Sequence, residues 1–242
     1  MNDLDTHLDN LVDTFKRDLI DDTTILSTGY NSLDRKIDGY RRGCITEIFG
    51  KEATAKTYLS LKAMKEVSDL GGLSIYIDSD NTFKEKYFED FGIDNKSVIL
   101  FKPEFGEDII DFVYRITDIT GVDLLIIDSI TSVLPREGED GVSHIKYVTK
   151  LVKKISTLIG EYSMYCIFTN QVRDDGSKQG TSTGGKILRF YTGLRLNTIG
   201  RRKYLMHEDE IIGETIAIDI IKNTFSDEKK SRDNTTIDIY YT

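Results

Sequence analysis

Residues 44–57 read CITEIFGKEATAKT, in which an apolar run passes through Gly50 into a polar loop that ends at Lys56 and Thr57. In proteins that bind phosphate groups, such a loop joins a strand to a helix and wraps its backbone N–H groups around the phosphates. The lysine reaches the terminal phosphates and the hydroxyl holds magnesium. Gly50, Lys56 and Thr57 have the spacing that this chemistry requires, so the stretch predicts a nucleotide-binding loop between a strand and a helix.

The loop departs from the usual pattern at Ala55, because a second glycine normally precedes the lysine. Alanine adds a methyl group where the backbone runs closest to a bound phosphate. Two interpretations follow: a working loop, or a vestigial loop that no longer supports catalysis. We expect nucleotide contacts from the whole stretch and the residue after it: Gly50, Lys51, Glu52, Ala53, Thr54, Ala55, Lys56, Thr57 and Tyr58.

Outward from this loop, short apolar runs alternate with stretches of helical character. Strands are expected at 44–49, 73–78, 98–101, 122–128 and 163–169, and helices between them at 55–70, 81–91, 107–120 and 143–160. Apolar strands separated by helices form a mostly parallel sheet with both faces covered, which is an α/β fold. Further runs with tight connections predict an antiparallel extension of the same sheet, at 194–200, 215–222 and 236–242.

The beginning of the chain predicts an N-terminal helical arm. Apolar residues recur there at spacings of three and four, which places them on one stripe of a helix: Leu4, Leu8, Leu11, Val12, Phe15 and Leu19. That stripe packs either against the core of its own chain or against a neighbouring subunit. We expect two parts, an arm at 1–22 for subunit docking and a core at 23–242.

The composition is that of one globular core. Of the 242 residues, 39% are hydrophobic and 30% are charged, which suffices for a single substantial core. No apolar run is long enough to cross a bilayer and none resembles a signal peptide, so we expect a soluble cytoplasmic protein without a membrane partner. Cys44 and Cys166 lie in apolar runs as buried thiols, and the three histidines lack the spacing of metal ligands.

Two acidic positions follow predicted strands. Asp128 ends the apolar run VDLLIID, where a carboxylate downstream of a phosphate-binding loop orients magnesium through water. The run SIYID ends at Asp78, and Asp80 follows two residues later. For Asp80 we favour a base that polarises an attacking water. For Asp78 we favour the N-cap of the following helix.

Several blocks occur here in the order found in the RecA family of recombinases, which this chain resembles from Leu26 to Tyr241. The blocks are LSTGYNSLD, the phosphate-binding loop, YIDSD, VDLLIIDSITSVLP, FTNQVR, TSTGGKILRFYTGLRL and IIKN. An Asn-Gln-x-Arg segment followed by Thr-Gly-Gly is much rarer than a phosphate-binding loop. The resemblance implies a RecA-like ATPase core that uses ATP with Mg²⁺ and binds single-stranded DNA as a helical filament of identical subunits.

The resemblance also implies roles for single residues. Asp80 stands where the family has a glutamate as catalytic base, and Tyr87 matches the aromatic residue on which adenine stacks. Gln171 matches the residue that senses the γ-phosphate. Lys222 matches a basic residue that reaches the γ-phosphate on a neighbouring subunit, while its usual basic companion is replaced by Thr224.

A net charge of −9 argues against nucleic acid, but basic residues cluster locally. The resemblance places a DNA-binding loop at about 173–185, with a first DNA loop around 135–144. Its contacts are expected from Arg173, Lys178, Thr183, Gly184, Gly185 and Lys186. The alternative is a plain surface turn, since glycines and polar residues fit that equally well. With few aromatic residues, binding should be directed to the DNA backbone and tolerant of sequence.

Two functions remain open. The first is an ATP-dependent recombinase that coats single-stranded DNA and pairs it with a homologous strand. The second is a weakly hydrolysing or non-hydrolysing paralogue that binds, loads or anneals DNA, which the departures at Ala55, Asp80 and Thr224 suggest. Ala55, Asp80 and the compact length also resemble phage recombinases, so we expect a chain from a bacterial cell that a phage encodes.

Overall fold

The computed structural model describes residues 20–136, 141–173, 181–182, 185–225 and 233–241. Their centre is a nine-stranded sheet in the order β3-β2-β4-β5-β1-β7-β8-β9, with β6 beside β5. The strands are β1 Cys44–Gly50, β2 Ser74–Asp78, β3 Val98–Phe101, β4 Leu124–Asp128, β5 Tyr165–Arg173, β6 Thr181–Ser182, β7 Thr192–His207, β8 Glu210–Asn223 and β9 Asn234–Tyr240. The helices are α2 Asn31–Ile37, α3 Lys56–Asp69, α4 Lys86–Asp90, α5 Gly106–Thr120, α6 Gly141–Glu161 and α7 Gly185–Tyr191, with a 3-10 turn at Asn95–Ser97.

The sheet is parallel from β3 to β7 and antiparallel at β8 and β9. The predicted mostly parallel sheet with an antiparallel extension is therefore confirmed. Our expectation for 194–200 was wrong in one respect, because β7 pairs in parallel with β1. The chain crosses over through α7 before it enters β7, and such a crossover returns a strand in the parallel direction.

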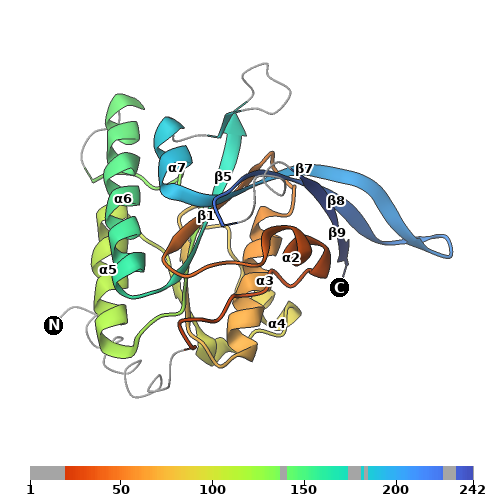
Figure 1. The fold of residues 1–242 in the computed structure, drawn as a ribbon, viewed down its shortest axis with the longest axis horizontal. Helices are drawn as coiled ribbons and strands as arrows, with labels where there is room; N and C mark the ends of the chain where they lie inside the picture. Colours follow the sequence, from red (N-terminus) through yellow and green to blue (C-terminus); the bar gives the residue numbers. More distant parts are fainter. Residues whose placement is uncertain (1–19, 137–140, 174–180, 183–184, 226–232, 242) are drawn as a thin grey trace.

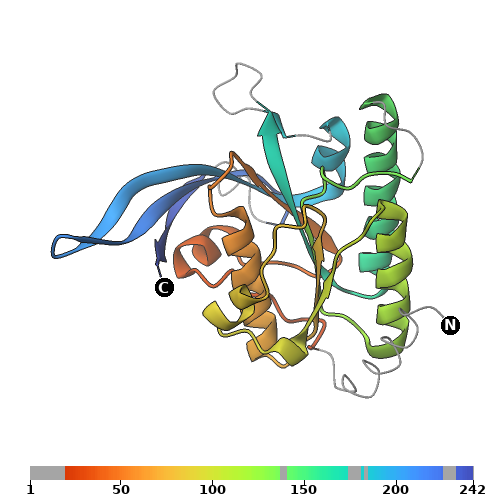
Figure 2. The same cartoon turned by 180° about the vertical axis from the view of Figure 1, so that it is seen from behind.

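Helices cover both faces of the sheet, as the apolar strands predict. Figures 1 and 2 show α5 and α6 on one face and α2, α3 and α4 on the other. Strand β2 shows how the side chains divide: Tyr76 packs in the cluster that contains Leu59 and Met64 of α3. Its neighbours Ile75 and Ile77 pack in the opposite cluster, with α5 and α6.

The helix expected at 81–91 is shorter than predicted, since α4 spans only Lys86–Asp90. The buried carboxylate of Asp78 accepts hydrogen bonds from the backbone N–H groups of Thr82 and Phe83, at 3.2 and 3.0 Å. Asn81, directly before Thr82, has a φ of 54°. Asp78 therefore holds a turn between β2 and α4, and the expected helix N-cap was wrong, because local side-chain bonds to the backbone compete with the first helical turn.

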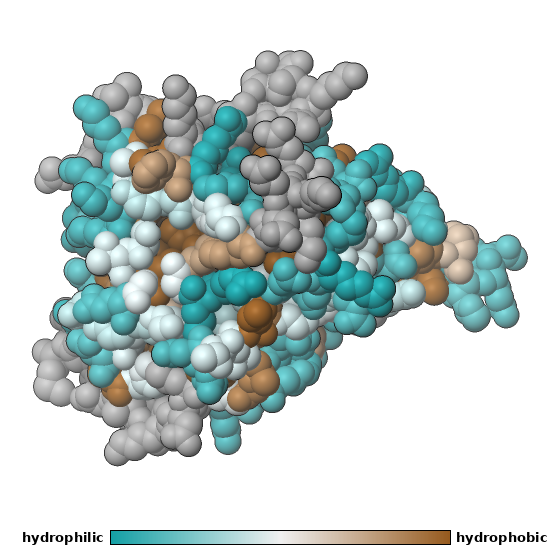
Figure 3. Space-filling model, in the orientation of Figure 1, coloured by the Kyte–Doolittle hydropathy of each residue, from teal (hydrophilic) through white to brown (hydrophobic). Residues whose placement is uncertain are grey.

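Strands β7 and β8 form a long hairpin that projects from the body of the molecule (Figure 1). Exposed apolar side chains lie along it, among them Met206 and Ile211, and Figure 3 shows an apolar patch near the outer end of the projection. No helix in the described part of the chain is long and apolar enough to cross a membrane.

The predicted arm lies almost wholly outside the described residues, since the description begins at Ile20. Ile20 is buried and its backbone N–H donates to Asp123, while its carbonyl accepts from Arg42. The Arg42 guanidinium also pairs with Asp123 at 2.7 Å. The first described residue of the arm, Ile20, is thus attached to the core beside the amino end of β4.

Candidate nucleotide site and nucleic-acid interface

The predicted phosphate-binding loop lies at the carboxyl end of the sheet, between the last residue of β1 and the first residue of α3. Gly50 has no room for a side chain, because a Cβ there would lie 2.3 Å from the hydroxyl oxygen of Thr198 on β7. Thr54 ties the loop together, since its hydroxyl donates to the carbonyl of Lys51 and lies 2.7 Å from the Thr198 hydroxyl. The loop leads straight into the amino end of α3, where unpaired N–H groups and the helix dipole favour anions.

Ala55, the departure from the usual pattern, is the residue before α3 and has a φ of 70°. Ala53 has a positive φ as well, at 53°. The left-handed conformation costs a residue with a Cβ about 1–2 kcal/mol, and glycine adopts it freely. The loop thus keeps the backbone shape that a glycine would give, at the expense of local strain.

Lys56 points its ammonium group back into the loop, where Nζ donates to the carbonyl oxygen of Lys51 at 2.6 Å. Burial lowers the pKa of this lysine, and the nearby carboxylates of Asp128, Glu52 and Asp80 act in the opposite direction. A partly desolvated cation whose described hydrogen-bond partner is a carbonyl suits the terminal phosphates of a nucleotide.

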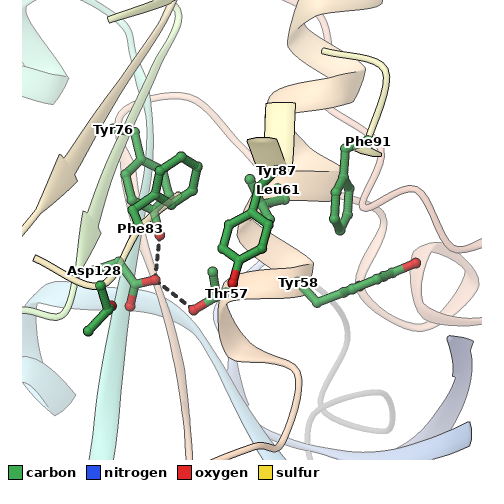
Figure 4. A pocket seen from close by; sticks show the side chains of 9 residues that line it. Thr57, Tyr58, Leu61, Tyr76, Phe83, Tyr87, Phe91 and Asp128 are labelled. Carbon is green, nitrogen blue, oxygen red and sulfur yellow. Dashed lines mark hydrogen bonds between the residues drawn. The ribbon is translucent and has the colours of Figure 1, made fainter. Parts of the chain in front are cut away.

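Asp128 ends β4 beside the loop, and its carboxylate accepts hydrogen bonds from three hydroxyls. Oδ2 accepts from Thr57 at 2.7 Å and from the Tyr76 hydroxyl (Figure 4). Oδ1 accepts from Thr169. The structure therefore brings together the two residues that we expected to hold magnesium, Thr57 and Asp128.

Tyr76 and Thr169 were not singled out from the sequence. Thr169 ends the apolar run SMYCIFT at the same sheet edge as Asp128, so the edge rule for parallel strands could have found it. Tyr76 lies within a buried strand, and no sequence signal separates its hydroxyl from that of an ordinary core tyrosine. Burial raises the pKa of Tyr76 well above its usual value, and the Asp128 carboxylate raises it further, so the hydroxyl remains a donor.

The donor set fits magnesium bound together with a nucleotide. No cluster of three or more His, Cys, Asp or Glu side chains suited to a metal occurs among the described residues. Magnesium usually keeps several waters and takes one or two protein oxygens plus phosphate oxygens, so a larger protein cage is not needed. The Thr57 hydroxyl and the Asp128 carboxylate would provide those protein contacts.

Asp80 is half-buried just beyond β2. Burial raises the pKa of its carboxyl group, and the Asp128 and Asp78 carboxylates add to this, whereas a Ser132 hydrogen bond and Lys56 lower it. A carboxylate with a raised pKa is a better proton acceptor, which suits the predicted role as a base. The role itself stays a prediction.

A pocket of about 340 Å³ lies beside Thr57 and Asp128 and has mainly aromatic walls (Figure 4). Its lining residues are Thr57, Tyr58, Leu61, Tyr76, Thr82, Phe83, Tyr87, Phe91 and Asp128. Aromatic faces can stack on a planar base. The pocket contains Tyr87, the predicted stacking partner, and Tyr58, the residue directly after the predicted loop.

Gln171 lies on β5 opposite Gly50, so the predicted sensor residue and the phosphate-binding loop are neighbours in the sheet. Directly after it, Val172 and Arg173 pair antiparallel with Ser182 and Thr181, and α7 follows. Residues 181 and 182 of the predicted DNA-binding loop are therefore paired to β5 directly after Gln171.

The DNA-contact residues themselves are only partly covered. Lys178, Thr183 and Gly184 lie outside the described residues, and Gly185 begins α7. Arg173 and Lys186 are described by their backbone alone. The predicted contacts with DNA stay predictions.

Part of the predicted first DNA loop also lies outside the description, at 137–140. On either side of that gap the chain is tied to the core. Arg136 pairs with Asp108 at 2.6 Å, and His144 Nε2 lies 3.1 Å from the carbonyl oxygen of Val133. The loop thus starts and ends near the amino end of α5 and the carboxyl end of β4.

Lys222 is not near the nucleotide loop of its own chain. The backbone of Lys222 on β8 stands opposite Arg195 on β7. Its Nζ donates to the carbonyl oxygens of Arg189 and Thr192, at the end of α7. Thr192 stands level with Ile45, five residues before Gly50, or about 16 Å at the rise of a strand. Within one chain, Lys222 and the phosphate-binding loop are therefore separate.

Comparison with known proteins gives one consistent result. A family model described as the RecA N-terminal domain matches residues 11–242. Protein RecA of Mycoplasma mycoides is 32% identical over 217 residues, which are 85% of this chain and 61% of that protein. Protein RecA of Chlorobaculum parvum is 33% identical over 212 residues, 82% of this chain and 60% of that protein. The chain thus spans about three fifths of the length of these relatives.

Proposed function

The chain belongs to the RecA family, and from that premise we propose that it is an ATP-dependent recombinase core that binds single-stranded DNA as a filament and promotes homologous pairing. The observation that carries the proposal is the joint position of Lys56, Thr57 and Asp128 at one edge of the sheet, with Gln171 opposite Gly50. This arrangement supports a site in which nucleotide chemistry is coupled to the DNA-binding segment.

In the proposed reaction, the loop N–H groups and Lys56 bind the phosphates of ATP, while Thr57 and Asp128 hold the metal ion. Magnesium, when bound, neutralises charge that develops on the phosphates. Asp80 accepts the proton of the attacking water, for which its raised pKa is suited. The aromatic pocket with Tyr87 takes the base.

Coupling to DNA is proposed to pass along β5. Gln171 contacts the γ-phosphate, and the segment that begins at Val172 responds to that contact. In the ordered form, Arg173, Lys178, Thr183, Gly184, Gly185 and Lys186 bind the phosphates of single-stranded DNA. The antiparallel pairing of β5 with β6 supports this proposal, because it joins residues 181 and 182 of the segment to the strand that carries Gln171.

We further propose that Lys222 acts on the ATP of a neighbouring subunit. Its ammonium is hydrogen-bonded to Thr192, a position about 16 Å along the sheet from Gly50 of its own loop. A second subunit whose phosphate-binding loop lay near α7 of the first would have the Lys222 ammonium beside its ATP. Hydrolysis would then be a property of the filament. The arm at 1–22 would hold the subunits together.

The nucleotide part is tested by the affinity for fluorescent ATP in the presence of Mg²⁺. Lys56→Ala removes the cation nearest the phosphates and should weaken binding by about 2–3 kcal/mol, because a charged hydrogen bond is lost. Lys65→Ala is the matched control, because Lys65 lies on the same helix, pairs with Asp69 and is not among the residues that line the pocket. Equal affinity of the Lys56 variant and the control would contradict the assignment.

The DNA part is tested by the salt dependence of binding. Binding should be tighter for single strands than for duplex, insensitive to sequence, and steeply weakened by salt through counterion release. Charge reversal at Lys178 and Lys186 should lower the affinity and flatten the salt slope. Wild-type binding by that double variant would exclude the segment as the DNA contact.

The trans role of Lys222 is tested by mixing two inactive variants. Lys56→Ala subunits cannot use their own site but keep Lys222, and Lys222→Ala subunits have the opposite defect. Co-assembled filaments should therefore regain part of the DNA-stimulated turnover. A truncation of residues 1–19 should remove self-association, and it spares Ile20, which packs in the core. No rescue, together with full activity of the truncated monomer, would contradict trans catalysis.

A weakly hydrolysing paralogue that loads or anneals DNA is the second candidate. The strained Ala55 and the short Asp80 side chain favour it, because both lie where catalysis is most sensitive to position. DNA binding with ATP but without turnover would identify this function. We also propose that the protein acts in the cytoplasm of a bacterial cell, with a phage as the source of its gene.

A further inference from the structure

Tyr76 is a buried tyrosine whose hydroxyl reaches the nucleotide site. It lies in the middle of β2, is 1% exposed, and packs its ring against Phe83 with 4.4 Å between the ring centres. Its backbone stands beside Ile126 of β4, and its hydroxyl donates to Oδ2 of Asp128, two residues further along that strand. Figure 4 shows the Tyr76 and Thr57 hydroxyls converging on the same carboxylate.

The hydrogen bonds leave Asp128 little capacity to accept more. A carboxylate has about four lone-pair sites. Oδ2 accepts from Thr57 and Tyr76, and Oδ1 accepts from Thr169, so three of those sites are taken. About one site remains to face the metal that the proposed function requires.

We propose that Tyr76 is a positioning residue that fixes Asp128 so that it holds the metal ion through a single metal-bound water. The inference rests on the proposed ATP and Mg²⁺ site and specifies how that site is ordered. Among the donors on Oδ2, Thr57 must also turn a lone pair toward the metal, whereas Tyr76 only needs to hold the carboxylate. Hydrogen-bonded neighbours of this kind orient metal-holding carboxylates in other proteins.

The test removes one oxygen atom and leaves the ring. Tyr76→Phe keeps the wall of the pocket and the packing against Phe83, but it lets the Asp128 carboxylate rotate. Tyr40→Phe is the matched control, because Tyr40 is also 1% exposed and its hydroxyl has no hydrogen-bond partner among the described residues. Urea unfolding of each variant measures any general loss of stability.

Two binding measurements separate the metal from the nucleotide. Binding of fluorescent ADP is measured as Mg²⁺ is added. Binding of Mn²⁺ in the presence of ADP is measured from the concentration of free Mn²⁺ by electron paramagnetic resonance. In Tyr76→Phe the concentration of Mg²⁺ or Mn²⁺ for half-maximal effect should rise about tenfold. ADP binding without metal should stay unchanged, and Tyr40→Phe should match wild type in both measurements.

Each other outcome overturns the inference. Unchanged metal dependence in Tyr76→Phe, with wild type responding normally, would show that the hydroxyl does not position Asp128. A loss of ADP affinity that is equal with and without metal would make Tyr76 only a wall of the base pocket. Absence of any metal-dependent nucleotide binding in wild type would refute the proposed function, and this inference with it.

Discussion

One aspartate directly precedes strand β4 and another is its last residue, and the two have opposite surroundings. Asp123, before the strand, is fully buried and is bound by the Arg42 guanidinium and by the N–H groups of Ile20 and Leu73. Asp128, at the carboxyl end, is partly buried and accepts hydrogen bonds from three hydroxyls. In the described part of the chain, no cation forms an ion pair with Asp128.

The difference separates structural from functional carboxylates. At Asp123 the protein supplies the compensating charge, so the site is closed and holds the chain together. At Asp128 the described residues supply hydroxyl donors that orient the carboxylate but no ion pair, so the carboxylate can act on a ligand. The same residue type therefore stabilises the fold at one edge of the sheet and is available for chemistry at the other.

The largest effect on stability is expected from Asp123→Asn. The Arg42 guanidinium, whose side chain is 6% exposed, would lose its counter-charge in the core. Removing one partner of a buried ion pair costs about 3–5 kcal/mol, so the free energy of unfolding in urea should fall by that amount. Nucleotide affinity of the protein that remains folded should not change. A loss below 1 kcal/mol would remove Asp123 from the structural side of the comparison.

The same substitution at the other end, Asp128→Asn, should cost less stability, about 1–3 kcal/mol, because hydroxyl donors lose an acceptor but no buried cation loses its partner. Turnover of ATP should fall about a hundredfold, since the charge that orients the metal ion is lost. Parallel unfolding and turnover measurements on the two variants check the comparison directly. Equal losses of stability would mean that both ends of β4 are structural.

The pH dependence of turnover tests Asp80, which shares the edge with Asp128. As a base, Asp80 must be ionised, so turnover is lost as the pH falls through its pKa. Burial and the neighbouring carboxylates raise that pKa, so the acid limb should lie above the ordinary value of 3.8. Ser132→Ala removes a hydrogen bond that lowers the pKa and should move the limb to still higher pH. A limb that does not move would assign the titration to another group.

The smallest effect is expected from Ala55→Gly. Glycine relieves the left-handed strain but adds freedom to the unfolded chain, so stability should change by less than about 1 kcal/mol. Turnover should stay equal or rise, because the methyl group near the phosphates is gone. Ala53→Gly, at a second positive φ, is the control for strain alone. A clear drop in turnover specific to Ala55→Gly would show that the methyl group contributes to the site.

Much of this arrangement could be predicted because local sequence patterns specify the strands of the parallel core. Continuous apolar runs predicted β1 to β5, and the ends of two of these runs predicted that Asp80 and Asp128 lie at the same edge of the sheet. The turn held by Asp78 could not be predicted, because residues 81–91 have a helical pattern that the hydrogen bonds from the backbone to the Asp78 side chain override. Helix α7 was not predicted because its seven residues are too few to show a helical period.

The contacts of the site were less predictable than its location. Lys56, Thr57 and Asp128 have a spacing that the chemistry demands. The hydroxyls of Tyr76 and Thr169 reach Asp128 from neighbouring strands whose register the sequence does not specify. The position of Lys222 at the end of α7 depends in the same way on the pairing of β8 with β7. Such long-range contacts carry no local signal.

The central claim, a nucleotide site coupled to single-stranded DNA, is tested most directly by ATP turnover measured with and without single-stranded DNA. Wild-type protein should hydrolyse ATP faster when DNA is added, and Lys56→Ala should show neither the basal nor the stimulated rate. The matched Lys65→Ala control should behave like wild type. Identical turnover with and without DNA, in a protein that binds ATP normally and depends on Lys56, would contradict the coupling.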